Sequence, residues 1–553
     1  NSNRSFYSPV VNAICNFSLK YNKVIIIIRQ SFFRQVKNIL FDYTSGEIKM
    51  TSIPKNVKLR RELGLFSAVC LIISVMLGSG IFVSPANALK NTGSVGMCLI
   101  IWASCGLLSL LGAMSYAELG TVVNKSGGEF SFYQSAFADM HKFWGPLPSF
   151  IYSWVSIMYV RPAEVAIIIL TFSEYFIRPF SILTSMTPET EHTVKKTVSI
   201  LALGIITFIN YTSVKCFIKI QNVFTICKVT ACIFVIVGGL YQLYQGNTKN
   251  LMTGFEGTTL SIDTLPIAFY SGLWAYDGWT ATTVVSEEIK NPQRNILLSI
   301  LLAVPFVTMI YVLMNVSYLT VLSVAEMTSV QAVAVEFGTR ALGSFSFIIP
   351  LGVAMATFGC ALSVQFGITR LCFAASREGQ MLEVFSYVSV KKLTPAPAVV
   401  LQGLLTLICL LCGDIVVLIE FASFLVWMFY GISMAALIVM RYTKRDVKRP
   451  FKVPIIIPIF VLIVSTVLFI TPILNDPKPQ FLIGLVFILS AFLIYIPFVY
   501  QKKRLSIVDD FTKFIQYLMV VVPPEKDEGG AEENRSVEND KGETEAPMIA
   551  AVV

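Results

Sequence analysis

Apolar runs recur from residue 64 to residue 500, and they restrict the fold more than any other feature of this chain. Most of them approach the length of about 20 residues that a helix needs to cross the hydrocarbon core of a bilayer. Hydrophobic residues make up 55% of the sequence and charged residues only 14%, so polar groups are too few to cover a water-soluble protein. The runs are also too long for the alternating strands of a membrane β-barrel. The sequence therefore predicts an all-α polytopic membrane protein.

Twelve transmembrane helices are predicted, with both chain ends on the same side of the membrane. The predicted ranges are 64–89, 95–119, 148–176, 197–213, 221–243, 264–286, 296–320, 343–372, 396–412, 415–440, 454–474 and 480–500. Lysine and arginine gather before the first range, after the tenth and after the twelfth, and the positive-inside rule makes that side the cytosol. The net charge of +9 therefore reflects membrane orientation and does not indicate nucleic-acid binding.

Segments outside the helices differ in composition. Residues 1–63 are predicted to be a cytosolic N-terminal segment, of which residues 1–49 are expected to be dispensable or absent from the mature protein. Residues 64–500 form the predicted twelve-helix domain. Residues 501–525 alternate apolar and polar groups like an interfacial amphipathic helix and end in Val-Pro-Pro-Glu. Residues 526–553 are rich in acidic and small polar residues, which predicts a disordered cytosolic tail.

Catalytic and metal-binding patterns are missing from the sequence. It contains only two histidines, His141 and His192, and no HExxH, GxSxG or Walker pattern. A membrane enzyme needs nucleophiles, bases or metal ligands that face one another, and the apolar runs do not supply them. The chain is therefore not expected to be an enzyme or to bind a cofactor or a metal ion.

Two of the predicted helices contain residues that interrupt a helix. Gly78-Ser79-Gly80 breaks the first, while Gly272, Asp277 and Gly278 break the sixth. Because these are the first helices of two five-helix halves, paired breaks indicate a midplane binding site in an inverted-repeat transporter. The freed N–H groups attract a carboxylate and the freed carbonyls attract an ammonium group. The alternative is that the glycines only allow close helix packing, but two breaks together favour the site.

Ordered motifs extend this interpretation along most of the chain. They are Gly78–Pro85 (GSGIFVSP), Ser115–Thr121 (SYAELGT), Lys125–Glu129 (KSGGE), Gly145–Pro148 (GPLP), Gly272–Trp279 (GLWAYDGW), Ser376–Gly379 (SREG) and Leu393–Ala398 (LTPAPA). With them the chain resembles the light, catalytic subunits of heteromeric amino acid transporters, in the amino acid–polyamine–organocation superfamily. Within that family it is most similar to the b(0,+)-type exchangers of cationic amino acids, neutral amino acids and cystine.

The resemblance implies a LeuT-type fold, with a five-plus-five inverted repeat, broken helices 1 and 6, and two further helices. It also implies sodium-independent exchange of neutral and cationic amino acids, and of cystine, by alternating access at the plasma membrane. Two alternatives stay open at this point. One is a membrane receptor that senses amino acids without transporting them, and the other is an exchanger restricted to neutral amino acids.

The resemblance further implies a substrate site built from both broken helices. Its residues are Leu77, Gly78, Ser79, Gly80, Trp274, Ala275 and Asp277. Ser79 and Gly80 are expected to hold the substrate carboxylate. The carbonyls of Leu77 and of the three residues from the sixth helix are expected to receive the α-ammonium group. The ring of Trp274 is expected to close the site from outside.

Lys228 lies well inside the predicted fifth helix, where a charge needs a specific reason. In relatives that use sodium, a cation joins helices one and eight near this place. The Lys228 ammonium is therefore interpreted as a substitute for that cation, with a purely structural lysine as the alternative.

Further charged positions are expected to set selectivity and gating. Arg161 and Glu164 share one face of the third helix and are predicted to form an ion pair, although Glu164 facing a cationic substrate is the alternative. Asp277 either caps freed N–H groups or attracts a cationic side chain and takes part in gating. Val426 stands where the cystine/glutamate exchanger has an arginine, so anionic substrates are disfavoured.

A heavy-subunit glycoprotein is the partner that the resemblance implies. Light subunits usually bind it through a disulfide from the loop between helices three and four. Here that loop, Arg178 to Lys196, contains no cysteine. The usual covalent link is therefore excluded, and a non-covalent complex or a subunit that works alone is expected instead.

Overall fold

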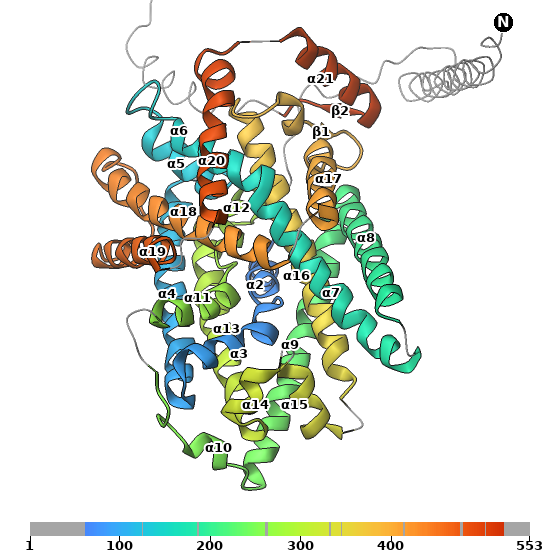
Figure 1. Cartoon of the computed structure of the whole chain (residues 1–553). Coiled ribbons are helices and arrows are strands. Elements are labelled where there is room, and N and C mark those ends of the chain that lie inside the picture. Colours follow the sequence, from blue (N-terminus) through green and yellow to red (C-terminus); the bar gives the residue numbers. More distant parts are fainter. Residues whose placement is uncertain are drawn as a thin grey trace, which may run out of the picture. The chain divides into compact units, whose positions relative to one another are not determined.

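The structure is a computed structural model that describes residues 61–524, apart from 124, 185–186, 260–263, 331–332, 344–345, 413–414, 476–478 and 504. The predicted N-terminal extension, residues 1–49, and the predicted acidic tail, residues 526–553, lie outside the described residues. Helices dominate the described part of the chain (Figure 1).

Each apolar range of the sequence overlaps a helix or a pair of helices. The first half contains α2 (Leu65–Met76), α3 (Gly80–Thr92), α4 (Val95–Val122), α5 (Glu129–Phe137), α6 (Leu147–Val155), the π-helix η1 (Ser156–Val160), α7 (Arg161–Thr184), α8 (Pro188–Thr212), α9 (Val214–Tyr244) and α10 (Lys249–Met252). It continues with α11 (Thr264–Tyr276), α12 (Ala281–Val284), the 3-10 helix η2 (Ser286–Glu288) and α13 (Pro292–Val321).

The second half completes the list of elements. It contains α14 (Val324–Ser329), α15 (Val333–Ala341), α16 (Ile348–Arg377), the 3-10 helix η4 (Glu383–Ser386), β1 (Val388–Ser389), α17 (Ala396–Cys412), α18 (Ile415–Thr443), α19 (Ile456–Asn475), α20 (Pro479–Ile494), the π-helix η5 (Tyr495–Tyr500), α21 (Ser506–Met519) and β2 (Val521–Val522). Several helices are longer than predicted, because their polar ends continue beyond the apolar run. For example, α9 starts at Val214 rather than residue 221 and includes the exposed Lys219.

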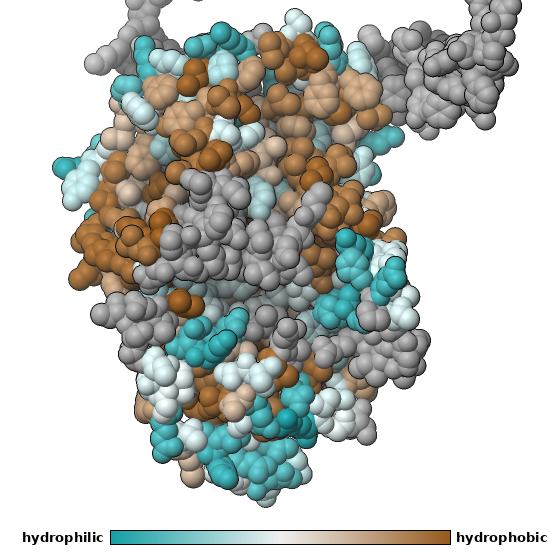
Figure 2. Space-filling model, in the orientation of Figure 1, coloured by the Kyte–Doolittle hydropathy of each residue, from teal (hydrophilic) through white to brown (hydrophobic). Residues whose placement is uncertain are grey.

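Seven helical stretches of the described residues are long and apolar enough to cross a membrane. They are Val95–Val122, Leu147–Ile177, Glu189–Thr212, Val214–Tyr244, Pro292–Val321, Ile348–Arg377 and Leu425–Thr443. Figure 2 shows apolar residues over much of the upper half of one face and hydrophilic residues at its lower end, around α10. The prediction of an α-helical membrane protein is confirmed, whereas the count of twelve spans stays a prediction.

The interrupted first helix lies among long helices from both halves of the chain. Its first part, α2, packs against α9, α13 and α16, while α3 packs against α11, the first part of the interrupted sixth helix. The helix α13 also packs against α4, and α16 against α7. Residues around both breaks are therefore enclosed by helices that are distant in sequence.

A buried ion pair fixes the segment that follows the sixth helix. Arg370 on α16 lies 2.6 Å from Glu288 on η2, and both side chains are fully buried. The neighbouring Glu287 pairs with Arg377 at 2.7 Å, also on α16. Because Arg370 and Arg377 lie two turns apart on one helix, they hold η2 against a rigid support.

One end of the bundle carries the short strand pair β1–β2 together with α5 and α21, and the other carries α10, α14 and α15 (Figure 1). Val388 pairs with Val522 and Ser389 with Val521 in antiparallel register. The sequence predicted α21, because apolar and polar residues alternate there as in an amphipathic helix. The short helices α5, α10, α14 and α15 were not predicted, since they fall in segments of mixed polarity between the apolar runs.

Candidate functional site

The first break separates α2 from α3 at Leu77, Gly78 and Ser79. The Gly78 N–H folds back to the Met76 carbonyl at 2.7 Å, so the regular helical pattern ends here. A new helix begins at Gly80, and the N–H groups of its first turn lack partners within the helix. These donors and the positive end of the helix dipole favour an anion beside Ser79 and Gly80.

The second break follows Tyr276, where α11 ends. The Asp277 N–H reaches back to the Trp274 carbonyl at 3.3 Å, and Gly278 then adopts a φ of +114°. This backbone conformation is strained for residues with a Cβ atom, which explains the glycine. Beyond this break no helical turn follows to donate hydrogen bonds to the last carbonyls of α11. The Trp274 carbonyl accepts from the Asp277 N–H and the Ala275 carbonyl from the Tyr311 hydroxyl, so each keeps one lone pair for a cation.

The two breaks lie directly against each other. A Cβ atom on Gly80 would lie 2.5 Å from Ala275 Cα, and one on Gly278 would lie 2.4 Å from Val75 Cγ1. Both glycines therefore permit close packing, which was the alternative interpretation of the sequence. The same contacts also bring the start of α3 next to the end of α11, so packing and a shared site occur together.

A buried tyrosine on α13 joins the two breaks, and sequence reasoning missed it. The Tyr311 hydroxyl lies 2.6 Å from the Met76 carbonyl and 2.9 Å from the Ala275 carbonyl. With one proton, it donates to one of these oxygens at a time. The only signal in the sequence was a tyrosine in the centre of an apolar run, which does not identify its partners.

Lys228 is fully buried in the middle of α9. Its Nζ lies 2.9 Å from Ser74 O, 3.1 Å from Leu77 O and 3.0 Å from Ala356 O. The hydroxyl of Ser74 is 3.4 Å away and contacts that of Ser363 at 3.0 Å. The ammonium group thus connects the first break to α16 through oxygen atoms alone. Leu77 O already accepts this bond, which leaves one lone pair for a substrate.

Arg161 begins α7 immediately after the π-helix η1 and lies between two carboxylates. Its Nη1 is 2.7 Å from Glu164 Oε2 and 3.7 Å from Asp277 Oδ2. Tyr430 on α18 donates a hydrogen bond to Asp277. The ion pair predicted from the spacing of Arg161 and Glu164 is therefore present, and the contact with Asp277 links α7 to the second break.

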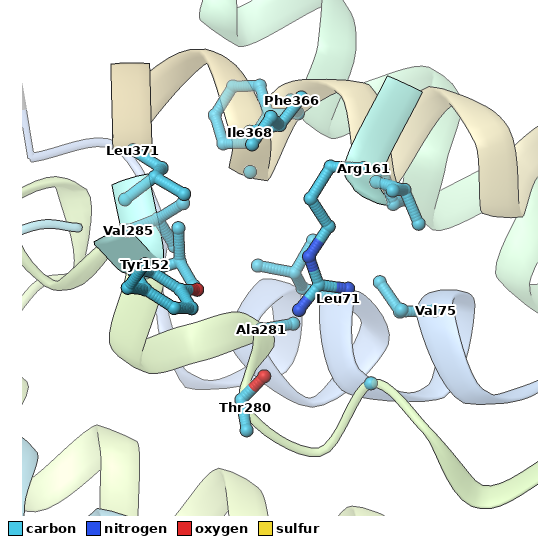
Figure 3. A pocket seen from close by; sticks show the side chains of 15 residues that line it. Leu71, Val75, Tyr152, Arg161, Thr280, Ala281, Val285, Phe366, Ile368 and Leu371 are labelled. Carbon is cyan, nitrogen blue, oxygen red and sulfur yellow. The ribbon is translucent and has the colours of Figure 1, made fainter. Parts of the chain in front are cut away.

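Two small cavities are lined by members of this charge cluster. One has a volume of about 50 Å³ and is lined by Arg161, Tyr152 and residues of α2, α12 and α16. Figure 3 shows Arg161 reaching into it towards Leu71 on α2, with Tyr152 on the opposite side. The other has a volume of about 20 Å³ and is lined by residues that include Trp274, Asp277 and Val426. Arg161 and Asp277, which contact each other, thus line different cavities.

The structure brings together most of the residues that the sequence singled out. Trp274 and Val426 line one cavity with Asp277, while Arg161 lines the other. Glu164 lines neither of these two cavities and contacts Arg161 instead. The cluster formed by one guanidinium and two carboxylates carries an excess of one negative charge when all three groups are ionised.

A family model described as "Amino acid permease" matches residues 63–522. The chain belongs to the amino acid permease family. It is 45% identical to mouse b(0,+)-type amino acid transporter 1 over 487 residues, which cover 87% of this chain and 96% of that protein. It is 39% identical to the human cystine/glutamate transporter over 475 residues, covering 85% of this chain and 92% of that protein.

A third similar protein is also an amino acid transporter subunit. The chain is 35% identical to mouse large neutral amino acids transporter small subunit 2 over 499 residues, covering 89% of this chain and 91% of that protein. This permease is therefore an amino acid transporter and not an enzyme. The resemblance to transporter light subunits of the b(0,+) type, which rested on motifs, is confirmed.

Proposed function

We propose that this permease is a sodium-independent exchanger of L-amino acids at the plasma membrane, with both termini in the cytosol. Its substrates are neutral and cationic amino acids, with cystine as a further one. It has twelve membrane helices in a LeuT-type inverted repeat and works by alternating access around the two breaks. The interruptions at Leu77–Ser79 and after Tyr276 support this arrangement.

The single observation that carries this proposal is the environment of Lys228. An ammonium group surrounded by the oxygens of Ser74, Leu77 and Ala356 has the ligands that a hard monovalent cation would take. A covalently attached positive charge occupies that place permanently. Transport then needs no sodium ion to join the first helix to α16, because Lys228 already does so.

The substrate's backbone groups are assigned to the two breaks. The first turn of α3, at Ser79 and Gly80, presents N–H donors and receives the carboxylate. The carbonyls of Trp274, Ala275 and Asp277 receive the α-ammonium group, together with the free lone pair of Leu77. Gly78 allows the turn between the half-helices, and Trp274 closes the site because its ring lines the cavity beside Asp277.

Cationic side chains are favoured by the charges around Arg161. Glu164 and Asp277 supply two carboxylates to one guanidinium, and all three side chains are largely buried. A second cation would balance the cluster, whereas an anion would be repelled by the excess negative charge. The apolar Val426 on the cavity wall gives an anionic side chain no partner.

Uptake by the purified chain in proteoliposomes tests the proposal. Radiolabelled leucine, arginine, cystine and glutamate are each offered with and without sodium, to vesicles that contain or lack an internal amino acid. Uptake of the first three that requires internal amino acid and ignores sodium is the expected result. Binding without uptake would instead identify a receptor, and sodium-dependent uptake would remove the role assigned to Lys228.

Ser79→Ala tests the carboxylate site more cleanly than a change at Gly80, whose Cβ atom would collide with Ala275. Loss of the hydroxyl removes one hydrogen bond of about 1 kcal/mol, so KM for every substrate is expected to rise about fivefold. Ser84→Ala, a buried serine on the same helix α3, is the matched control and should leave KM unchanged. Unequal effects of Ser79→Ala on leucine and arginine would place this residue at the side chain rather than the carboxylate.

A heavy-subunit glycoprotein is proposed to be absent or to bind non-covalently. The loop between α7 and α8 has no cysteine in its sequence. Electrophoresis of the native membrane protein without reductant is expected to show a single subunit. A larger species that disappears on reduction would show that another cysteine forms the link.

A further inference from the structure

The helix α21 exposes four large apolar side chains on one side. Ile507, Phe511, Phe514 and Leu518 are 74%, 40%, 60% and 56% exposed. Their spacing of four, three and four residues places them along one face of a helix. A water-soluble surface rarely presents such a continuous apolar stripe, so this face needs an occupant.

A second apolar face of α21 is already covered by the protein. Ile515 and Met519 pack in a cluster with Val384, Tyr387 and Val521. Immediately after the helix, β2 pairs with β1 in the loop between α16 and α17. The orientation of α21 is therefore fixed by this loop, and the stripe of Ile507, Phe511, Phe514 and Leu518 is turned to a different side.

The position of α21 along the chain indicates what covers the free stripe. The helix begins six residues after Tyr500, the last residue of the apolar helical stretch formed by α20 and η5. Exposed apolar residues continue along η5 to that point, including Ile496, Phe498 and Tyr500. Figure 1 shows α21 turning away from α20 and running beside β2. The stripe thus lies close to the apolar surface of η5 and is separated from it only by the short polar segment of residues 501–504.

Charge decides how the helix would bind to the bilayer. The sequence of α21 contains one lysine, Lys513, and two aspartates, Asp509 and Asp510. The cations Lys502, Lys503 and Arg504 precede the helix and are not part of it. The stripe itself therefore gains nothing from the negative surface of anionic lipids, and apolar burial must hold it in place.

We propose that α21 lies in the interface of the adjacent leaflet, with Ile507, Phe511, Phe514 and Leu518 inserted among the acyl chains. Its other apolar face holds the loop between α16 and α17, so the helix ties this loop to the membrane surface. In the proposed orientation the leaflet is the cytosolic one. The inference rests on the chain spanning a membrane and does not depend on which amino acids it exchanges.

Tryptophan fluorescence of the full-length chain in phosphatidylcholine vesicles tests this placement. One variant carries Phe514→Trp on the free stripe, and its control carries Lys513→Trp, one residue away on the polar side. The signal of the unchanged chain, which has six native tryptophans, is subtracted from each. Lipids brominated on their acyl chains report contact with lipid, and dissolved iodide reports contact with water. Leu518→Trp repeats the measurement where Phe514→Trp folds poorly.

Brominated lipid is expected to quench most of the fluorescence that Phe514→Trp and Leu518→Trp add. Iodide is expected to quench most of the fluorescence that Lys513→Trp adds. Adding phosphatidylserine should leave these values unchanged. Quenching of 514 and 518 by iodide instead would show that the stripe faces water and would overturn the proposal. Protection from both quenchers would show that a protein segment covers the stripe, and this result would also overturn the proposal. Lipid contact that requires phosphatidylserine would contradict insertion by apolar burial.

Discussion

Lys228 and Arg161 are two of the cations buried inside the helical bundle, and their surroundings differ in kind. Lys228 is held by three backbone carbonyls and a hydroxyl, and no carboxylate lies within 4.0 Å of it among the described residues. Arg161 is held by the carboxylates of Glu164 and Asp277. One charge is therefore stabilised by neutral dipoles, and the other by charges of opposite sign.

The two surroundings give the two cations different properties: the net charge around Lys228 is constant, whereas that around Arg161 changes when another cation binds. Carbonyl dipoles around Lys228 cannot be neutralised by a proton or replaced by a substrate. The Lys228 ammonium therefore keeps the residues of the first break bound to α16 whichever substrate is present. The carboxylates around Arg161 can attract a second cation, because together they exceed its charge. We infer that Lys228 supports transport of every substrate, whereas the cluster of Arg161, Glu164 and Asp277 discriminates among them.

Lys228→Ala is expected to have the largest effect, and the same effect on all substrates. It leaves three buried carbonyls without their donor, at about 1–3 kcal/mol each, so uptake should fall at least about 100-fold. The measurement is initial uptake of leucine and arginine in sodium-free buffer, normalised to the protein present. Lys219→Ala, an exposed lysine on the same helix, is the matched control and should retain full uptake.

Uptake by Lys228→Ala in the presence of sodium tests the same role of Lys228 further. With the ammonium group removed, the oxygens of Ser74, Leu77, Ala356 and Ser363 would surround an empty place for a cation. Partial recovery of the Lys228→Ala variant in sodium would support the substitution of a cation by lysine. Wild-type uptake by this variant without sodium would refute the role of Lys228 altogether.

Sequence alone predicted the helices because each requires only a long apolar run. It also predicted the breaks at Gly78–Ser79 and at Asp277–Gly278, since glycine and aspartate within such a run disfavour a helix locally. The break predicted at Gly272 was wrong, because this glycine lies inside α11, where it allows close packing against Cys105. The ends of α9 and α16 were less accurate, because helix ends reach into polar surroundings where hydropathy gives no signal. The short helices α5, α14 and α15 depend on packing against their neighbours rather than on their own composition.

The site was predictable where partners are close in sequence and unpredictable where they are not. Arg161 and Glu164, three residues apart, were expected to pair. The acceptors of Lys228 come from residues 154, 151 and 128 positions away, so only the fold identifies them. The same holds for Tyr311, whose hydroxyl meets a carbonyl 235 positions away.

Asp277→Asn is expected to lower uptake of arginine about tenfold relative to leucine. Asp277 lines the cavity next to Trp274, so its charge acts directly on a cationic side chain, and a loss of about 1.4 kcal/mol corresponds to tenfold. The asparagine keeps an acceptor for Tyr430, and Tyr430→Phe controls for loss of that hydrogen bond. The ratio of kcat/KM for arginine and leucine is measured in both variants. Equal losses for the two amino acids would assign Asp277 to gating rather than selectivity.

Glu164→Gln is expected to have the smallest effect, a fall of about threefold in the same ratio. It removes one negative charge, as Asp277→Asn does, so the net charge of the cluster becomes zero in both variants. Glu164, however, is bound to Arg161 at 2.7 Å and reaches a substrate only through that guanidinium. Glutamine can still accept the hydrogen bond from Arg161, so the arginine should stay in place and leucine uptake should change little.

The order of the two variants therefore decides which carboxylate faces the substrate. A larger effect of Asp277→Asn agrees with the cavity linings, in which Asp277 is present and Glu164 is not. A larger effect of Glu164→Gln would mean that the Glu164 side chain leaves Arg161 and faces the substrate during transport. The ion pair between Arg161 and Glu164 would then break in each transport cycle. The double variant separates these cases, because two carboxylates that act on one cationic side chain give non-additive changes in the arginine-to-leucine ratio.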